Sequence, residues 1–211
     1  QARSRGITDE RQFPKTLEMI PDPDPGATSL DPDESVGLIP SHIATREELN
    51  TWEWANVIDG ERWALKNIHR ELLSSRYVRT LHRRMFGHTW RWAGQFRLTE
   101  KNIGIEPSRI PMAVEQLCAD VQAQLDAGAL RIDEIAVRFS PRLVAIHPFA
   151  NGNGRHSRTM ADLLLMQRGA PRFSWGANQN QDAEAARQGY LRALRAADRG
   201  DYAPLLRFAR S

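Results

Sequence analysis

The feature that most limits the fold of this chain is the helical spacing of its apolar residues after position 110. In a first run they recur at i, i+3, i+4 and i+7, and this run is Val114, Leu117, Cys118, Val121 and Leu125. A second run with similar spacing is Ile132, Ile135, Ala136, Phe139, Leu143 and Val144. This period is typical of helices that bury one face. We therefore expect a mainly α protein, with a kink at Pro141, which lacks an N–H group.

Helices are also expected in the first half of the chain. Thr45 and Glu48 have the spacing of a capping box, which predicts that a helix begins after Thr45. Gly60 is expected to end this helix. Two more helices are expected over residues 61–73 and 77–86.

Two segments depart from helical spacing. Residues 1–40 are rich in Pro and Asp, which favours an extended N-terminal arm attached to a folded body over residues 41–211. Residues 96–110 begin with an apolar–polar alternation and are then interrupted by Asn102 and Gly104. This pattern predicts a small, irregular β-hairpin among the helices.

The composition narrows the class of protein. The chain has 211 residues, of which 41% are hydrophobic and 26% charged, as is ordinary for a globular domain. Cys118 is the only cysteine, so no disulfide framework is expected, and its place in an apolar run predicts a core residue. No apolar run reaches the roughly 18 residues of a membrane span. Residues 1–10 lack the apolar stretch of a signal peptide, so we expect a cytoplasmic protein without a membrane partner.

The charge balance bears on nucleic-acid binding. The 29 Lys and Arg residues exceed the 26 Asp and Glu residues by three, which gives a net charge of +3. Most of the basic residues are arginines scattered beside acids in the expected helices. Solvated helix faces are therefore favoured over a nucleic-acid surface.

The stretch HPFANGNGRHSR carries the residues with the clearest chemical meaning. His147 is expected at the C-terminal end of an apolar helix, because the following residue, Pro148, stops the helix. The turn at 152–154 leads into a second helix at about Arg155, whose first N–H groups form an anion site. Arg155 and Arg158 are three positions apart and are expected on one face of the first turn. An imidazole beside guanidinium groups and main-chain amides suits phosphoryl or nucleotidyl transfer.

Each of these features alone also fits a plain turn between two helices with solvated arginines. Their joint occurrence within twelve residues favours a site. His156, in the same stretch, is expected either to face solvent or to support the site from behind.

The stretch resembles the Fic motif, His-x-Phe-x-Asp/Glu-Gly-Asn-Gly-Arg-x-x-Arg. The matching positions are His147, Phe149, Gly152, Asn153, Gly154, Arg155 and Arg158. Further similar segments are residues 37–40, 81–87, 90–94, 102–107 and 194–202. Together they resemble the Fic subgroup named mobile mystery protein B, over residues 27–211. The resemblance implies a Fic-type helical bundle with a small β-hairpin, called the flap.

Fic enzymes mostly transfer AMP from ATP to a Tyr, Ser or Thr hydroxyl of a protein, and the resemblance implies this activity. It assigns His147 as the general base and Phe149 as the anchor of the loop. Arg155 and Arg158 would bind the β- and γ-phosphates. The phosphates would be cradled by Gly152, Asn153 and Gly154. The flap, which docks the target protein by strand addition, corresponds to Asn102, Ile103, Gly104, Ile105 and Glu106.

One position departs from the family pattern, because its acidic residue is replaced by Asn151. In the family that carboxylate holds Mg²⁺ on the ATP phosphates. An amide oxygen brings no negative charge, so we expect weakened Mg²⁺ binding and an attenuated transferase. Two alternatives stay open: a Fic-fold protein that binds nucleotide or protein without catalysis, and, less favoured, a basic helical nucleic-acid binder.

The Ser/Thr-x-x-x-Glu motif by which many Fic proteins inhibit themselves is absent from the sequence. One alternative is that Glu47, Glu48 or Glu53, on the helix expected after Thr45, approaches Arg158. An acidic helix start that complements the helix dipole is the favoured interpretation of these residues. The remaining route is inhibition in trans, which implies an antitoxin-like partner.

Overall fold

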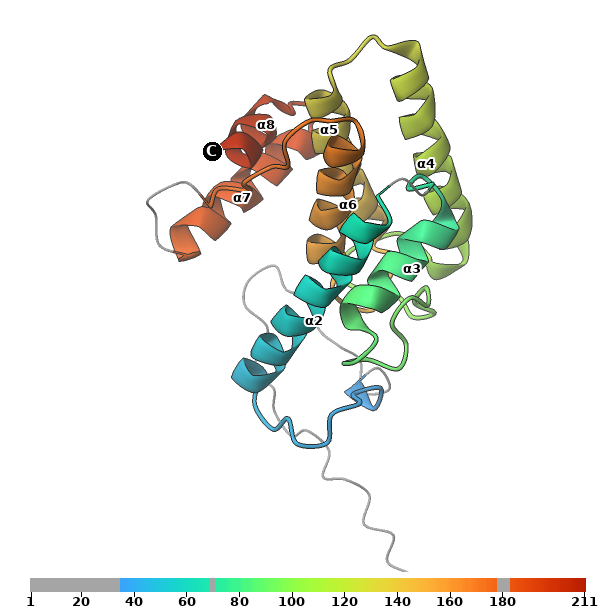
Figure 1. Cartoon of the computed structure of the whole chain (residues 1–211), viewed down its shortest axis with the longest axis vertical. Coiled ribbons are helices and arrows are strands. Elements are labelled where there is room, and N and C mark those ends of the chain that lie inside the picture. Colours follow the sequence, from blue (N-terminus) through green and yellow to red (C-terminus); the bar gives the residue numbers. More distant parts are fainter. Residues whose placement is uncertain (1–34, 69–70, 178–182) are drawn as a thin grey trace, which may run out of the picture.

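The computed structural model describes residues 35–68, 71–177 and 183–211, which form a bundle of helices (Figure 1). The helices are α2 (Arg46–Lys66), α3 (Ser75–Phe86), the 3-10 helix η1 (Pro107–Arg109), α4 (Ile110–Ala127), α5 (Ile132–Ile146), α6 (Asn153–Gln167), α7 (Ala183–Asp198) and α8 (Ala203–Arg210). Within the described ranges β pairing is limited to one isolated antiparallel bridge, between Leu38 and Trp90. The predicted mainly α class is confirmed.

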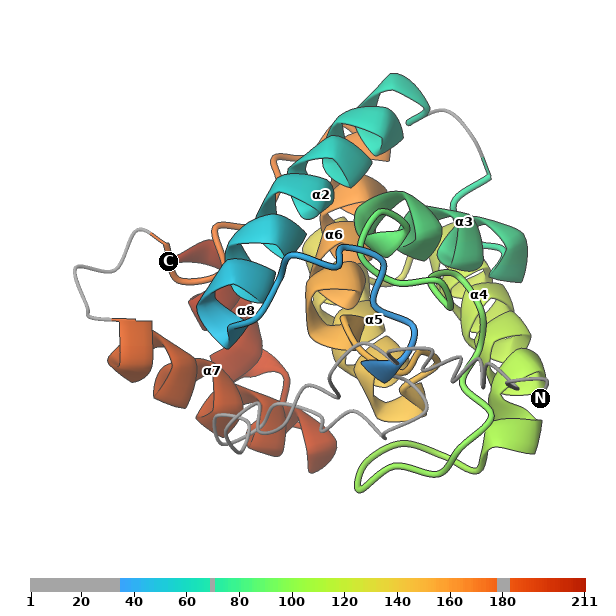
Figure 2. The same ribbon diagram turned by 90° about the horizontal axis from the view of Figure 1, so that it is seen from below.

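Helices α5 and α6 pack along each other at the centre of the molecule. The α2–α3 pair packs on this centre, while α4 covers one flank and the α7–α8 pair the opposite flank (Figures 1 and 2). The largest fully buried side chains are Leu72, Leu81, Met85, Phe86, Trp90, Ile110, Ile135, Phe139, Leu143, Phe149, Met160 and Leu164. The core therefore surrounds the two helices that carry the motif.

The start of α2 is confirmed, but its predicted end is wrong. Thr45 caps the helix and forms the expected capping box with Glu48. The helix then continues through Gly60 to Lys66, so residues 61–66 do not belong to a separate helix. A Cβ added at Gly60 would lie 2.8 Å from Met85 Cα, so this glycine allows α2 and α3 to pack closely.

Cys118 of α4 is a core residue, as predicted, with 3% of its surface exposed. Burial raises the pKa of its thiol to about 12, and the charges of Glu115 and Glu71 act in the same direction. A thiol with such a pKa is not a nucleophile at neutral pH.

The predicted arm covers residues 1–40, of which 1–34 lie outside the described residues, so its boundary stays a prediction. The described end of the arm pairs with the turn after α3: Ile39 N–H donates to Thr89 O at 2.8 Å, and Arg91 N–H donates to Gly37 O at 2.9 Å. In the described part of the chain, none of the helices combines the length and apolarity that crossing a bilayer requires.

Candidate active site

His147 lies where α5 ends, as the sequence predicts. It is the C-cap residue, with φ 53° and ψ 61° in the left-handed region. Its N–H donates to Leu143 O at 3.2 Å, and Pro148 follows. A residue with a side chain is strained in this region by about 1 kcal/mol, so the surrounding structure must hold it there.

The imidazole of His147 is neutral at neutral pH. Only 3% of the residue is exposed. Burial is the main reason that its pKa falls to about 4; the positive charges of Arg97 and Lys101 lower it further, and a hydrogen bond to the Val144 backbone opposes the shift. A neutral imidazole has a ring nitrogen that can accept a proton, as a general base requires.

The loop between α5 and α6 is closed by Phe149 and Asn153. The Phe149 N–H donates to Asn153 Oδ1 at 3.0 Å, and Asn153 Nδ2 donates to Phe149 O at 2.7 Å. Phe149 is fully buried, and its ring stacks on His82 with centroids 3.7 Å apart. Phe149 therefore lies where an anchor is expected. The side chain of Asn153 shapes the loop, so only its main-chain N–H is placed to meet an anion.

A buried histidine of α3, His82, is hydrogen-bonded to the backbone of this loop. The His82 Nδ1 atom accepts a hydrogen bond from Gly94 N–H at 3.0 Å, so Nε2 carries the proton and donates to Asn151 O at 3.0 Å. Burial lowers the pKa of His82 well below its ordinary value. A neutral His82 thus ties the backbone at Asn151 to the turn at Gly94.

The second helix, at whose start an anion site is predicted, is formed and begins two residues earlier than expected. Helix α6 starts at Asn153, with Gly152 as its N-cap at φ 78°. A Cβ added at Gly152 would lie 2.6 Å from Phe86 Cζ, so this turn requires glycine. The N–H groups of residues 153–155 have no acceptor within the helix and, with the helix dipole, favour an anion.

The two motif arginines bracket this helix end. The Arg155 guanidinium lies 5.0 Å from the centre of the Phe86 ring of α3, and the Arg158 guanidinium lies 5.3 Å from that of Tyr190 of α7. Arg158 Nη1 is 3.7 Å from where a Cβ on Gly154 would stand, so it lies beside the first turn. The three-residue spacing predicts one common face, yet the two side chains contact different helices.

Arg155 is engaged by an acidic residue of α2. Glu53 Oε2 lies 2.5 Å from Arg155 Nη2, and Glu53 Oε1 accepts from Trp90 Nε1 at 2.6 Å. Glu53 is only 3% exposed. From the sequence, an acidic residue of this helix was an alternative partner for Arg158; in the structure Glu53 pairs with Arg155 instead, while Glu48 forms the capping box.

Residues 97–106, here called the flap loop, cover His147. Gly104 has φ 102°, and a Cβ added to it would lie 2.6 Å from His147 Cβ. Glycine is therefore required for the loop to approach the histidine this closely. The exposed positions of the predicted docking segment are Asn102, Ile103, Gly104 and Glu106, with Ile105 half-buried.

The hairpin predicted within residues 96–110 is not formed, because the structure has no strand there. The main-chain amides of the flap loop instead donate to carbonyls at the end of α5 and just after it. Arg97 N–H donates to Pro148 O at 2.9 Å, and Ile105 N–H donates to Ile146 O at 3.4 Å. The two arms of the flap loop are linked by the Arg97 side chain, whose guanidinium donates to the carbonyls of both arms.

Asn151, at the family's metal position, is a weak ligand. Its Oδ1 accepts from Gly152 N–H at 2.5 Å and carries no negative charge. Throughout the described ranges, no three His, Cys, Asp or Glu side chains are grouped to hold a metal ion. The donors of the described chain therefore fit a resident Mg²⁺ ion poorly.

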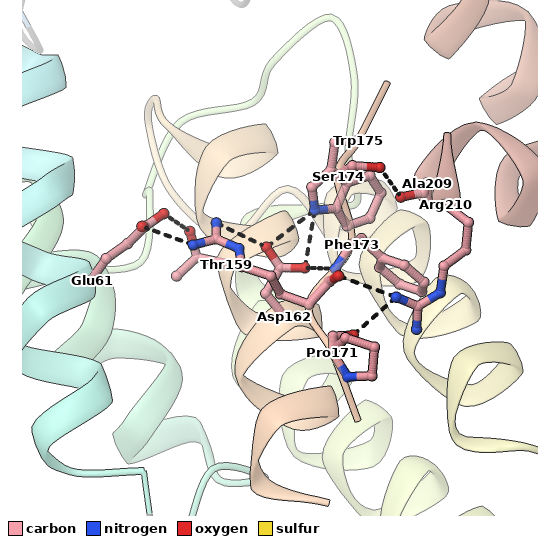
Figure 3. Close-up of polar contacts among 10 residues, drawn as sticks. Glu61, Thr159, Asp162, Pro171, Phe173, Ser174, Trp175, Ala209 and Arg210 are labelled. Carbon is pink, nitrogen blue, oxygen red and sulfur yellow. Dashed lines mark hydrogen bonds and ion pairs between the residues drawn. The ribbon is translucent and has the colours of Figure 1, made fainter. Parts of the chain in front are cut away.

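A polar cluster around Asp162 links α6 to the segment that contains Phe173 and Trp175 (Figure 3). Asp162 is 4% exposed and accepts from Phe173 N–H at 3.1 Å and from Trp175 Nε1 at 3.1 and 3.2 Å. Burial raises the pKa of Asp162 to about 6, against the effect of these donors and a nearby guanidinium. Trp175 packs edge-on against Tyr190, with centroids 6.3 Å apart, and the Arg158 guanidinium lies over the Tyr190 ring. The cluster is therefore linked to Arg158 through Trp175 and Tyr190.

Of the two placements expected for His156, the structure shows the buried one. The residue is 0% exposed, and its Nε2 donates to Val78 O at 2.9 Å. Its ring meets Phe149 edge-on, with centroids 5.2 Å apart. Burial lowers its pKa to about 4.

Three residues that hold the site, Glu53, His82 and Arg97, have roles that the sequence does not predict. The partners named above lie 102, 69 and 50 positions away along the chain, so local spacing does not indicate these three contacts. For His82 a signal does exist: it lies four residues after Val78 and four before Phe86, on the apolar stripe of α3.

Residues 64–165 match the family model described as Fic/DOC family. A protein adenylyltransferase Fic of Drosophila mojavensis is 31% identical over 165 residues, which are 72% of this chain and 31% of that protein. The protein of that name from Nematostella vectensis is 33% identical over 139 residues, 61% of this chain and 29% of that protein. The chain thus spans about a third of the length of these relatives.

Solved structures share the fold. A Fic domain containing signalling protein from Bacteroides thetaiotaomicron superposes with a TM-score of 0.59 at 21% identity, over 72% of this chain and 66% of that one. The N-terminal Fic domain of Bep8 from a Bartonella species gives 0.64 at 14% identity, over 81% and 88%. The fold and site define a helical domain in which a histidine at a helix end is joined by a short loop to the N-terminus of the next helix. Over residues 64–165, which carry this arrangement, the chain is similar to the Fic/DOC family.

Proposed function

We propose that this chain is a protein adenylyltransferase, which transfers AMP from ATP to a hydroxyl group of a target protein. One observation carries the proposal: the neutral imidazole of His147 is joined by a short loop to a helix N-terminus bracketed by Arg155 and Arg158. The names of the curated relatives support it. So does the ADP bound to a fold neighbour from Bartonella quintana.

The geometry suggests how the reaction proceeds. The ATP phosphates bind at the α6 N-terminus, where the N–H groups of residues 153–155 and the two guanidinium groups offset their charge. His147 takes the proton of the target hydroxyl. The hydroxyl oxygen bonds to the α-phosphorus, the bond to the β-phosphate breaks, and pyrophosphate leaves. Arg155 can bind a phosphate oxygen only when it releases the Glu53 carboxylate.

The target protein docks on the flap loop in this proposal. Asn102, Ile103 and Glu106 are exposed on the loop that covers His147, so a segment lying over them has its hydroxyl near the base. Mg²⁺ would come with ATP, held chiefly by the phosphates, because Asn151 offers only an amide oxygen.

The finer placement in the subgroup named mobile mystery protein B is part of the proposal, as are a bacterial cytoplasm and an antitoxin-like partner. Two of the segments that carry the subgroup resemblance, residues 37–40 and 90–94, are hydrogen-bonded to each other in the structure. This pairing supports treating them as one feature.

Intact-protein mass spectrometry after incubation with ATP tests the function. We expect a mass increase of one AMP on the chain itself or on proteins of an added bacterial extract. The increase should disappear in His147→Ala and persist in His88→Ala, whose histidine is exposed and lies outside the site. No AMP on any protein, across a range of Mg²⁺ concentrations, would contradict the proposal.

A nucleotide binder without transferase activity is the second candidate. It is favoured by Asn151, which offers catalytic Mg²⁺ no negative charge, whereas the α6 N-terminus and Arg158 still favour an anion. ATP binding detected by calorimetry without any AMP transfer would select this function.

A further inference from the structure

Arg97 is a buried arginine whose guanidinium binds main-chain oxygens. The residue is only 4% exposed. Its Nε donates to His147 O at 2.7 Å and its Nη1 to Thr99 O at 2.6 Å, while Nη2 donates to Ile105 O. A buried charge is costly unless its donors are satisfied, so these bonds define where the side chain lies.

The three acceptors belong to the two parts of the site that must work together. Thr99 and Ile105 are on the two arms of the flap loop, and His147 is the strained residue at the end of α5. Gly104 lies between the Arg97 guanidinium and the His147 side chain, because a Cβ added there would be 2.7 Å from Arg97 Nη2 and 2.6 Å from His147 Cβ. One side chain therefore joins both loop arms to the backbone of the base.

We propose that Arg97 is a positioning residue, which fixes the flap loop and the His147 backbone in a single relative arrangement. This proposal rests on the proposed function, in which the base acts on a hydroxyl presented on the flap loop. The planar fork of arginine suits the task, because its donors diverge toward three separate carbonyl oxygens. Lysine has the same charge but a single ammonium group, which lacks this fork.

The charge of Arg97 has a second effect that a purely structural arginine would lack. The positive groups that lower the pKa of His147 are Arg97 and Lys101, both on the flap loop, and Arg97 has the larger effect. Removal of the Arg97 charge favours the protonated imidazole, so the pKa of His147 rises. Replacement by lysine keeps the charge and loses the geometry.

Two variants, Arg97→Lys and Arg97→Met, separate these effects. We expect kcat for AMP transfer to fall by about 10–100-fold in both, since a base displaced by about 1 Å loses this much rate. The KM for ATP should change by less than about threefold, because the phosphates bind at α6. The pKa of His147, followed by NMR and assigned with His147→Gln, should rise in Arg97→Met and stay low in Arg97→Lys.

Arg142→Met is the matched control. Arg142 is on α5, the helix that ends at His147, and pairs with Asp120 of α4. We expect its kcat to stay within about twofold of wild type and the His147 pKa to stay low. If Arg97→Met does not fold, Arg97→Lys alone decides, and a kcat within about twofold of wild type overturns the proposal.

The NMR titration needs no ATP and no target, so it distinguishes two kinds of failure. Wild-type protein that transfers no AMP contradicts the proposed function. The titration then still tests whether Arg97 lies beside His147. An unchanged His147 titration in a folded Arg97→Met variant would show that the Arg97 guanidinium does not lie beside His147, which overturns the proposal that Arg97 is a positioning residue.

Discussion

At the scale of single residues, one atom at position 151 controls the charge offered to a metal. Asn151 Oδ1 accepts from Gly152 N–H, and an aspartate oxygen at the same place would keep that bond and add a negative charge. We expect Asn151→Asp to raise the rate of AMP transfer about tenfold or more, with tighter dependence on Mg²⁺. Initial rates over a Mg²⁺ series measure this. Asn151→Ala removes the oxygen and serves as the control, and no gain with aspartate would contradict the expectation.

The two glycines of the motif have different tasks, which alanine substitution separates. Gly152→Ala places a methyl group 2.6 Å from Phe86 Cζ at a φ of 78°, so thermal unfolding should show a loss of about 2 kcal/mol or more. Gly154 is helical with Arg158 Nη1 at 3.7 Å, so Gly154→Ala should gain up to about 1 kcal/mol. The added methyl group covers the anion site, and we expect ATP binding measured by calorimetry to weaken severalfold.

Gly128→Ala is the control for backbone strain alone. Gly128 has φ 63° and no atom within 4 Å of an added Cβ. Its loss of stability should be about 1 kcal/mol, below that of Gly152→Ala. Undiminished ATP binding in Gly154→Ala would show that phosphates do not approach this turn.

At the scale of elements, α2 and α6 are joined by the Glu53–Arg155 pair. In a Glu53→Gln variant the new amide oxygen can still accept from Trp90, but the ion pair is lost. We therefore expect this variant to lower the KM for ATP severalfold, because phosphate no longer competes with a carboxylate for Arg155, and to cost about 1–2 kcal/mol of stability. Steady-state kinetics and urea denaturation measure the two effects.

Glu61→Gln is matched to this variant, since Glu61 is also on α2 and pairs with Arg172 at 3.7 Å. Its KM for ATP should equal that of wild type. A Glu53→Gln variant with a raised KM would show instead that Glu53 holds Arg155 in its phosphate-binding position.

Sequence reasoning succeeds for those elements whose determinants are local. The apolar periods of α4 and α5 and the capping box at Thr45 lie within single helices, and all are found. Gly60 is misread because a glycine that stops a helix and one that packs against Met85 look alike in sequence. The flap loop is misread as a hairpin because its amides bind residues about 40 to 50 positions away.

The same distinction, between local determinants and long-range contacts, decides which residues of the candidate site can be predicted from the sequence. His147 and the turn into α6 are contiguous, so their relation follows from the motif. Glu53, His82 and Arg97 meet the motif only after the bundle has packed. Their contacts depend on tertiary structure, which a single sequence does not display.

At the scale of the whole molecule, three buried histidines make the fold sensitive to acid. His82, His147 and His156 are each at most 3% exposed, and burial lowers the pKa of each, to about 4 for His147 and His156. Between about pH 4 and the ordinary value of 6.5 the unfolded chain binds more protons than the folded one. The stability that they contribute is therefore complete above this window and is lost as the pH falls through it.

Asp162 acts in the opposite direction, because its raised pKa of about 6 lets the folded state bind a proton that the unfolded chain releases above 3.8. From pH 7 to about pH 5 it should add about 1 kcal/mol, whereas His147 and His156 should each remove about 2 kcal/mol. We expect a net loss of at least about 3 kcal/mol, since His82 acts in the same direction as the other two histidines, and urea denaturation at the two pH values measures it. His156→Gln should lower stability at pH 7 but reduce the pH dependence, and His88→Gln, an exposed site, should leave it unchanged. Equal stability at both pH values would mean that these imidazoles are not held neutral by the fold.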